Sequence, residues 1–143
     1  MSALTLVETG WARDAPRLAV VRRRVFIDEQ GVPERLEWDA DDAVSTHWLA
    51  LADGSPVGCA RLLPDGQICR MAVLPAWRGR GIGRALLGAA LATARVRGHR
   101  TVRLSAQVHA AAFYARAGFV VRGEVYEEAG IPHVAMEKAL ASS

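Results

Sequence analysis

The sequence predicts a single α/β domain (an α+β arrangement with a mixed sheet) over residues 1–143, in the order β-α-β-β-β-α-β-α-β-β. Three observations predict this class. The length is that of one ordinary domain. Apolar segments with strand-like alternation are separated by turn signals rich in Gly, Pro and Asp. Other segments repeat their apolar residues with the helical period.

The first half of the chain is predicted to supply four strands and one helix. Residues 4–8 alternate as a strand, and residues 16–27 place Leu18, Val21 and Val25 on one helical face. Turn signals at residues 53–56 and 63–66 then separate three further strands. These strands are expected at residues 46–51, 57–63 and 67–73.

The second half is predicted to supply two helices and three strands. Residues 84–97 follow the helical period and are followed by Gly98, a typical residue for the end of a helix. A shorter helix at residues 109–117 is followed in the same way by Gly118. The remaining strands are expected at residues 101–106, 119–121 and 133–137.

The charged residues are unevenly distributed, although the formal net charge is only +3. Ten arginines and no acidic residue lie between Gly66 and Gly123, whereas seven acidic residues and one basic residue lie between Asp28 and Asp42. One part of the domain could therefore hold a polyanion while another attracts a cation. The alternative is that both stretches are ordinary solvated surfaces.

Composition also excludes several classes of protein. No apolar run reaches the length of a membrane span, and the N-terminal residues lack the layout of a signal peptide. Two cysteines give no disulfide framework, so we expect a cytoplasmic protein in which Cys59 and Cys69 are free thiols. No His, Cys, Asp and Glu residues have the spacing of metal ligands, so no metal is expected.

A glycine-rich turn, Arg78-Gly79-Arg80-Gly81-Ile82-Gly83, lies between a predicted strand and a predicted helix. Backbone N–H groups at a helix start are unpaired and carry partial positive charge. Glycines let a phosphate approach those groups closely. The turn is not a Walker A loop, because no lysine is present in it, and it lacks the G-x-G-x-x-G spacing of a dinucleotide fingerprint. It therefore indicates a pyrophosphate site of another kind, the alternative being a plain tight turn.

The pattern Arg/Gln-x-x-Gly-x-Gly/Ala between a strand and a helix is the acyl-CoA signature of the GNAT superfamily of N-acetyltransferases. Residues 78–83 resemble it at every specified position, and the order of elements resembles the GNAT fold over essentially the whole chain. Longer stretches resemble the ElaA-like branch of that superfamily. They are residues 24–33 with Glu37-Trp38-Asp39 and Asp42, and residues 104–107, 113–119 and 130–133 with Met136.

The resemblance implies acetyl-CoA as cosubstrate. The strand before the glycine turn would pair through its backbone with the pantetheine arm, and the amides of the turn would hold the pyrophosphate. Many relatives have an Asn near the end of the following strand; this chain contains no Asn, and Gln107 stands nearby. The implied cosubstrate-binding residues are Met71, Ala72, Val73, Arg78, Gly79, Arg80, Gly81, Ile82, Gly83, Arg84 and Gln107.

For catalysis, the resemblance implies direct attack of an amine on the thioester, with Tyr114 as the general acid for the leaving thiolate. Candidates for the general base are Glu29, Glu34, Glu37 and His109, of which Glu29 and Glu37 are preferred. Glu34 and Asp39, in the acid-rich stretch, are candidates for binding a cationic acceptor. His133 is expected to make a structural hydrogen bond at the start of a strand.

The predicted function is thus transfer of an acetyl group from acetyl-CoA to an amine of a small molecule or peptide. Two alternatives remain. One is a catalytically silent CoA-binding sensor. The other is an Arg-rich nucleic-acid-binding module, which is disfavoured because aromatic residues make up only 6% of the chain. A membrane partner is not expected, and a homodimer is possible.

Overall fold

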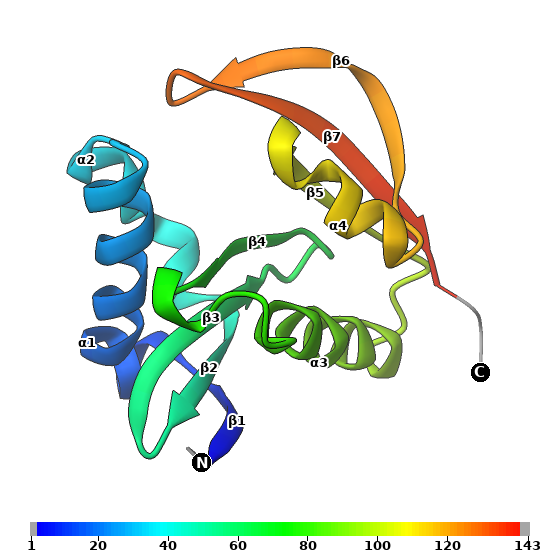
Figure 1. Ribbon diagram of the computed structural model, residues 1–143. Coiled ribbons are helices and arrows are strands. Elements are labelled where there is room, and N and C mark those ends of the chain that lie inside the picture. Colours follow the sequence, from blue (N-terminus) through cyan, green and yellow to red (C-terminus); the bar gives the residue numbers. More distant parts are fainter. Residues whose placement is uncertain (1–2, 141–143) are drawn as a thin grey trace.

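A computed structural model describes residues 3–140, in which seven strands form two sheets (Figure 1). The strands are β1 (Leu4–Thr9), β2 (Thr46–Ala52), β3 (Ser55–Leu62), β4 (Ile68–Val73), β5 (Thr101–Gln107), β6 (Val120–Glu128) and β7 (Ile131–Ala139). The helices are α1 (Trp11–Arg22), α2 (Glu34–Glu37), α3 (Ile82–Val96) and α4 (Ala111–Arg116). This is the predicted order of strands and main helices. The outermost residues of the predicted domain, 1–2 and 141–143, lie outside the described part.

The first sheet is antiparallel, with the order β1-β2-β3-β4, and it is covered on both faces (Figure 1). Helix α1 packs on one face, where Leu18 and Val21 join a buried cluster with Leu49 of β2. Helix α3 packs on the other face, where Leu86 joins a cluster with Trp48. Neighbouring residues of a strand point to opposite faces, and because both faces are covered, β2 is apolar and buried from Trp48 to Ala52.

Helix α1 begins earlier than the predicted residues 16–27. It starts at Trp11 and has a kink at Asp14, whose backbone leaves the helical region (φ −129°, ψ 21°). Pro16 follows two residues later, so the regular part of the helix does begin close to the predicted start. The chain then continues beyond Arg22 as a π-helical segment, Arg23–Glu29, which carries it to the edge of β4.

The second sheet has the order β5-β7-β6 and is also antiparallel. Strand β5 buries Val102, Leu104 and Ala106 on one face, as the sequence predicted. Strands β6 and β7 are longer than predicted. The register of β6 shifts between Arg122 and Tyr126, around Gly123 with φ 88°, and β6 is exposed along its whole length. A bulged, solvated strand has no clean alternation of apolar residues, so the sequence shows only its first part.

The two sheets meet at one point and then separate. Gln67 forms an isolated parallel bridge with Arg103, whose amide donates a hydrogen bond to the Gly66 carbonyl over 3.2 Å. Beyond this point β4 and β5 belong to different sheets, and a gap opens between them. Within residues 3–140 no helix is both long and apolar enough to cross a membrane.

Candidate active site

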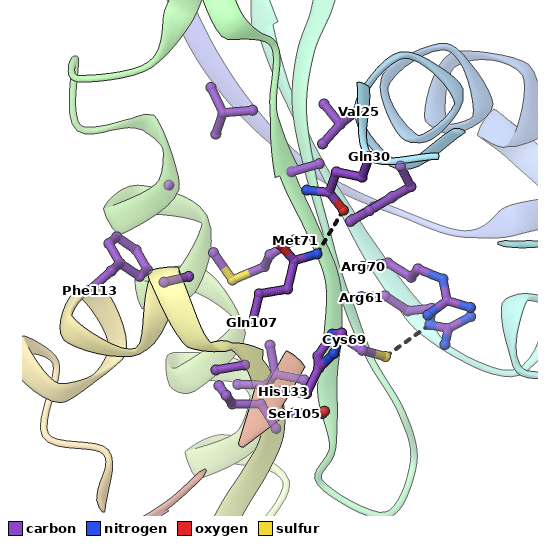
Figure 2. A pocket seen from close by; sticks show the side chains of 18 of the residues that line it. Val25, Gln30, Arg61, Cys69, Arg70, Met71, Ser105, Gln107, Phe113 and His133 are labelled. Carbon is purple, nitrogen blue, oxygen red and sulfur yellow. Dashed lines mark hydrogen bonds between the residues drawn. The ribbon is translucent and has the colours of Figure 1, made fainter. Parts of the chain in front are cut away.

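The gap between β4 and β5 is a cleft of about 1030 Å³ (Figure 2). Its walls include the glycine-rich turn, β4, the end of β5, helix α4, the π-helical segment and the start of β7. All of the predicted cosubstrate-binding residues except Arg80, and the predicted acid Tyr114, therefore line one cavity. A cleft with apolar walls and a few convergent polar groups is the usual form of a small-molecule site.

A β-bulge in β4 shapes the middle of the cleft. Cys59 of β3 lies opposite Ala72, and Arg61 lies opposite Cys69, so Arg70 and Met71 together face a single residue of β3. Arg70 has φ 51°, a left-handed conformation that costs a residue other than glycine about 1–2 kcal/mol. Bulges bend a strand and end its regular pairing, which is why β4 turns away from β5 here.

Beyond the bulge, β4 presents an open edge to the cleft. The Leu74 N–H donates a hydrogen bond to the Val57 carbonyl of β3 over 2.8 Å, so the main-chain groups of Val73 point away from β3. The Val73 carbonyl accepts a hydrogen bond of 2.9 Å from Arg78 Nε. Its N–H lies on the same side of the strand, where it is available to an extended ligand. Of the predicted strand residues, Met71 and Val73 are half-buried and Ala72 is buried.

The glycine-rich turn leads directly into α3, a helix of 15 residues. No side chain caps the first amides of this helix. Gly79 and Gly81 have φ values of 77° and 82°, and a Cβ atom at either position would meet nothing within 4 Å. The turn therefore exposes unpaired N–H groups in open space next to the cleft, the arrangement that holds a phosphate group at a helix N-terminus.

The arginines of the turn have different surroundings. Arg78 forms a bidentate pair with Glu29 of the π-helical segment, at 2.8 Å and 2.5 Å. This pair ties the turn to the opposite wall, and the hydrogen bond from Arg78 lowers the pKa of the Glu29 carboxyl. The guanidinium of Arg80 lies 4.7 Å from the ring centroid of Trp77. Arg84 lies on α3 and lines the cleft.

Tyr114 lies on α4 and points toward β4. Its hydroxyl group is 3.9 Å from the sulfur of Met71, and Phe113 and Phe119 contact its ring edge-on, with centroids at 5.0 Å and 5.9 Å. Burial raises the pKa of Tyr114 to about 12, so the phenol is protonated at neutral pH. A protonated phenol beside the open edge of β4 can donate a proton to a leaving group there.

Gln107, at the end of β5, contacts the opposite wall of the cleft. Its amide nitrogen donates a hydrogen bond of 2.7 Å to the side-chain oxygen of Gln30 (Figure 2). The two glutamines are far apart in the chain, and sequence reasoning missed Gln30. Their hydrogen bond crosses the cleft and separates the side with Phe113 and the glycine-rich turn from the side that contains Cys69, Ser105 and His133.

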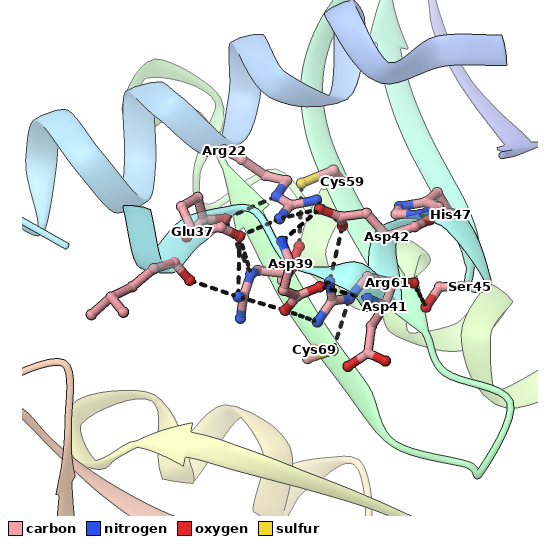
Figure 3. A network of polar contacts seen from close by, with 12 residues as sticks. Arg22, Glu37, Asp39, Asp41, Asp42, Ser45, His47, Cys59, Arg61 and Cys69 are labelled. Atoms are coloured by element: carbon pink, nitrogen blue, oxygen red, sulfur yellow. Dashed lines mark hydrogen bonds and ion pairs between the residues drawn. The ribbon is translucent and has the colours of Figure 1, made fainter. Parts of the chain in front are cut away.

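Beyond this bridge, the wall of the cleft rests on an arginine–carboxylate network (Figure 3). It consists of Arg22, Arg61, Arg70, Glu37, Asp39 and Asp42. Arg22 donates to Glu37 over 2.8 Å and to Asp42 over 2.6 Å. Arg61 donates to Asp39 over 2.7 Å and to Asp42 over 2.9 Å. Arg70 lies 3.2 Å from both Glu37 and Asp39, so three cations face three anions.

Burial affects the two innermost carboxyl groups in different ways. Glu37 and Asp42 side chains are only 3% and 2% exposed. Burial raises the pKa of Glu37 more than its neighbouring arginines lower it. Burial also raises the pKa of Asp42, but hydrogen bonds from Arg22 and Arg61 outweigh this effect and keep the pKa below its usual range.

The predicted acidic site residues are thus engaged with arginines of the same chain. Glu29 and Glu37 line the cleft, but each is ion-paired. Asp39 lines the cleft between Arg61 and Arg70. Glu34 is exposed, pairs with Arg23 over 2.7 Å and is not among the residues that line the cleft. The acid-rich stretch is therefore largely neutralised from within, and its charge alone no longer indicates a cationic acceptor.

Arg61 and Arg70 are site residues that sequence reasoning missed. Arg61 had a visible signal, because it interrupts an otherwise apolar predicted strand at residues 57–63. Cys59 and Cys69 are free, as expected, and Cys69 accepts a hydrogen bond of 3.2 Å from Arg61. Among residues 3–140, no group of three His, Cys, Asp or Glu side chains is placed to hold a metal ion.

Comparisons with known proteins identify the family to which this fold corresponds. Residues 11–140 match the model of a family described as acetyltransferase (GNAT) domain. The chain is 35% identical over 130 residues to protein ElaA of Escherichia coli strain K12, an alignment that covers 85% of this chain and 84% of ElaA. It is also 35% identical over 122 residues to the uncharacterized N-acetyltransferase YjcF of Bacillus subtilis, covering 82% and 87% of the two chains.

Solved structures show the same fold. An acyl-CoA N-acyltransferase from Pseudomonas aeruginosa superposes with a TM-score of 0.85 and 35% sequence identity, covering 96% of this chain and 100% of the other. The crystal structure of Escherichia coli ElaA also gives a TM-score of 0.85, with 30% identity and coverage of 95% and 99%. The predicted fold class and the predicted likeness to ElaA are therefore confirmed.

Proposed function

The chain belongs to the GNAT family of acetyltransferases, and we propose that it transfers the acetyl group of acetyl-CoA directly to an amine of a small molecule or peptide. The family implies an acyl-CoA cosubstrate. The observation that carries the proposal is that one cleft joins the three parts such a reaction requires. These are an anion site at the start of α3, an open strand edge on β4 and a protonated phenol at Tyr114.

The cosubstrate would lie along the cleft with its diphosphate at the turn. The amides from Gly79 to Arg84 would bind the diphosphate, because they are unpaired and Gly79 and Gly81 leave open space above them. The pantetheine arm is itself an amide chain, so it can pair with the free main-chain groups of Val73 as a further strand would. This orientation brings the thioester toward Met71 and the bulge.

The chemistry is attack of a neutral amine on the thioester carbon. The C–N bond forms, the C–S bond breaks, and Tyr114 donates its proton to the departing thiolate. Because burial raises the pKa of Tyr114 to about 12, the phenol carries its proton at neutral pH and can donate it to the thiolate. A main-chain N–H at the bulge would stabilise the oxyanion of the tetrahedral intermediate.

The proposal is tested in two steps. Calorimetry with coenzyme A and with acetyl-CoA measures binding, and a panel of primary amines with acetyl-CoA measures release of free thiol. We expect binding of both nucleotides and amine-dependent thiol release. Binding without release by any amine would favour a catalytically silent CoA-binding sensor. The absence of binding would contradict the proposal altogether.

A further inference from the structure

The cleft contains a histidine to which the proposed chemistry assigns no role. His133 lies on β7, directly opposite Gln107 of β5 on one side and Tyr126 of β6 on the other. Side chains at paired positions point to the same face of a sheet, and on this face Gln107 and His133 line the cleft. His133 is 7% exposed, and Figure 2 shows it on the side of the cleft that contains Cys69.

The contacts of the ring define which nitrogen is basic. Nδ1 lies 2.7 Å from the Ile131 carbonyl oxygen, the structural hydrogen bond that the sequence predicted. A carbonyl oxygen only accepts hydrogen bonds, so Nδ1 carries a proton and the neutral ring has its lone pair on Nε2. Nε2 lies 3.5 Å from a carboxylate oxygen of Glu128, at the end of β6.

Further contacts hold the imidazole in this orientation. The Tyr126 ring stacks on it with a centroid distance of 6.2 Å and an interplanar angle of 27°. The Tyr126 hydroxyl group is in turn hydrogen-bonded to Ser105 of β5. The ring is therefore fixed by the Ile131 carbonyl at Nδ1 and by Tyr126 on its face, while the lone pair of Nε2 makes no hydrogen bond to Glu128 in the neutral ring. A carbonyl that accepts a hydrogen bond from Nδ1–H, and so leaves Nε2 as the basic nitrogen, resembles the way in which enzymes orient a histidine base.

We propose that His133 is the general base, an inference that rests on the acetyl transfer proposed above. Nε2 of His133 removes a proton from the acceptor ammonium group, directly or through one water molecule. The two carboxylates predicted for this role are less suitable. The pKa of Glu29 is lowered by its pair with Arg78, and Glu37 is buried between Arg22 and Arg70. An imidazole exchanges protons near neutral pH, where a general base is most effective.

The protons balance in this scheme. The ammonium gives one proton to His133, and the resulting amine attacks the thioester carbon. The thiolate takes the Tyr114 proton, and the tyrosinate regains a proton from the nitrogen that has been acetylated. The products are an amide, the thiol of coenzyme A and one proton on His133, which then passes to solvent.

Several charged or titratable groups surround the imidazole and would set its pH dependence. Glu128 and Tyr126 belong to β6, beside it in the same sheet. Across the cleft lie Cys69 and the guanidinium groups of Arg61 and Arg70 with their partner Asp39. The carboxylate of Glu128 is the group in contact with Nε2.

The decisive variant is His133→Asn. The asparagine amide can still donate to the Ile131 carbonyl, but it has no basic nitrogen in the place of Nε2. We expect kcat/KM for the amine to fall by about a hundredfold or more, with the loss of the acidic limb of its pH profile and unchanged affinity for acetyl-CoA. The matched control is His99→Asn, at a histidine that does not line the cleft, and it should leave the rate unchanged.

A measurement without turnover complements the kinetics. Nitrogen-15 NMR of labelled histidine in the wild-type protein should show the Nδ1–H form for neutral His133, assigned by the signal that His133→Asn removes. A neutral ring protonated on Nε2, or a His133→Asn variant with the wild-type rate and pH profile, would overturn the inference. A loss of rate confined to Glu29→Gln would do the same, although the proposed function would stand. Failure of the wild-type protein to bind coenzyme A would remove both.

Discussion

Arg22 is the most deeply buried cation of the arginine–carboxylate network, and its replacement by methionine should destabilise the protein strongly. The side chain is 1% exposed and contacts Glu37 and Asp42. Its guanidinium also lies 5.3 Å from the Trp11 ring centroid and 5.0 Å from that of Trp38. Methionine keeps much of the apolar volume but removes the charge and every hydrogen-bond donor.

The magnitude follows from the balance of charges. In the Arg22→Met variant, Glu37 still has Arg70 and Asp42 still has Arg61, but two cations then face three carboxylates. One buried negative charge is left uncompensated, which typically costs about 3–5 kcal/mol of the free energy of unfolding. With urea m values of about 1–3 kcal/mol per M, the midpoint should fall by about 2 M. The melting temperature should fall by roughly 10 °C.

The loss should also depend on pH. The pKa of Asp42 is depressed in the folded wild-type protein, so its contribution to stability is present above its unfolded pKa and is lost as pH falls. In the variant, Glu37 loses a cation and its pKa, already raised by burial, rises further. A carboxyl group with a raised folded pKa destabilises the protein as pH rises through that value. The difference between variant and wild type should therefore narrow on acidification.

Urea unfolding followed by tryptophan fluorescence is a suitable assay, because Trp11 and Trp38 flank the substituted side chain. The matched control is Arg23→Met, at the next residue, whose partner Glu34 is exposed. Exposed ion pairs contribute little to stability, so this control should unfold at the wild-type midpoint. Equal midpoints for Arg22→Met and Arg23→Met would refute the argument from burial.

Three further predictions concern the turn, the acid and a buried histidine. Tyr114→Phe should lower kcat by about a hundredfold with unchanged calorimetric affinity for coenzyme A; an unchanged rate would remove Tyr114 from the mechanism. Gly81→Ala, at φ 82°, should cost about 1–2 kcal/mol and weaken coenzyme A binding, whereas Gly88→Ala, in open space on α3, should stabilise by about 0.5–1 kcal/mol with unchanged affinity. Burial lowers the pKa of His47 in the folded protein, so below about pH 6.5 the unfolded chain binds a proton there more readily. The free energy of unfolding therefore falls as pH falls through about 6.5. In His47→Gln, whose amide can still donate to the Asp42 carbonyl, urea midpoints should change less between about pH 7.5 and 5.5 than in the wild type.

The side of the cleft formed by the glycine-rich turn could be predicted from the sequence, because its elements are adjacent in the chain. A strand end, a turn with three glycines and a helix start are adjacent in the chain, so the exposed amides follow from backbone rules alone. Tyr114 was predicted through the family resemblance, because the periodicity of residues 109–117 indicates only a helix. Local pattern could not show the pair between Arg78 and Glu29, which are 49 residues apart, or the contact of Tyr114 with Met71.

The other side of the cleft, beyond the Gln30–Gln107 hydrogen bond, is built from residue pairs that are distant in sequence. The acid-rich stretch suggested an exposed anionic surface, but Glu37 and Asp42 are buried against Arg22 of α1 and Arg61 of β3. Which arginine meets which carboxylate depends on the packing of α1 on the first sheet. Local pattern does not encode that packing. His133 was predicted to make a structural hydrogen bond, and its hydrogen bond to the Ile131 carbonyl is present. Its contact with Glu128 was not predicted, because the approach of Glu128 depends on a bulge in β6 that the sequence does not reveal.

The acid-rich stretch also has a consequence for the chemistry of the cleft. Arg70 occupies a strained left-handed conformation at the bulge that bends β4 away from β5. Its guanidinium is held by the Leu36 and Glu37 carbonyls, at 3.4 Å and 3.1 Å, and by the carboxylates of Glu37 and Asp39. These contacts offset the backbone strain, so the segment between Leu36 and Asp39 stabilises the bulge from outside the sheet. The bulge opens the edge of β4 along which the thioester is proposed to lie. The carboxylates therefore act on the proposed cosubstrate site through the backbone of β4. Substitutions among these carboxylates should change acetyl-CoA affinity as well as acceptor binding.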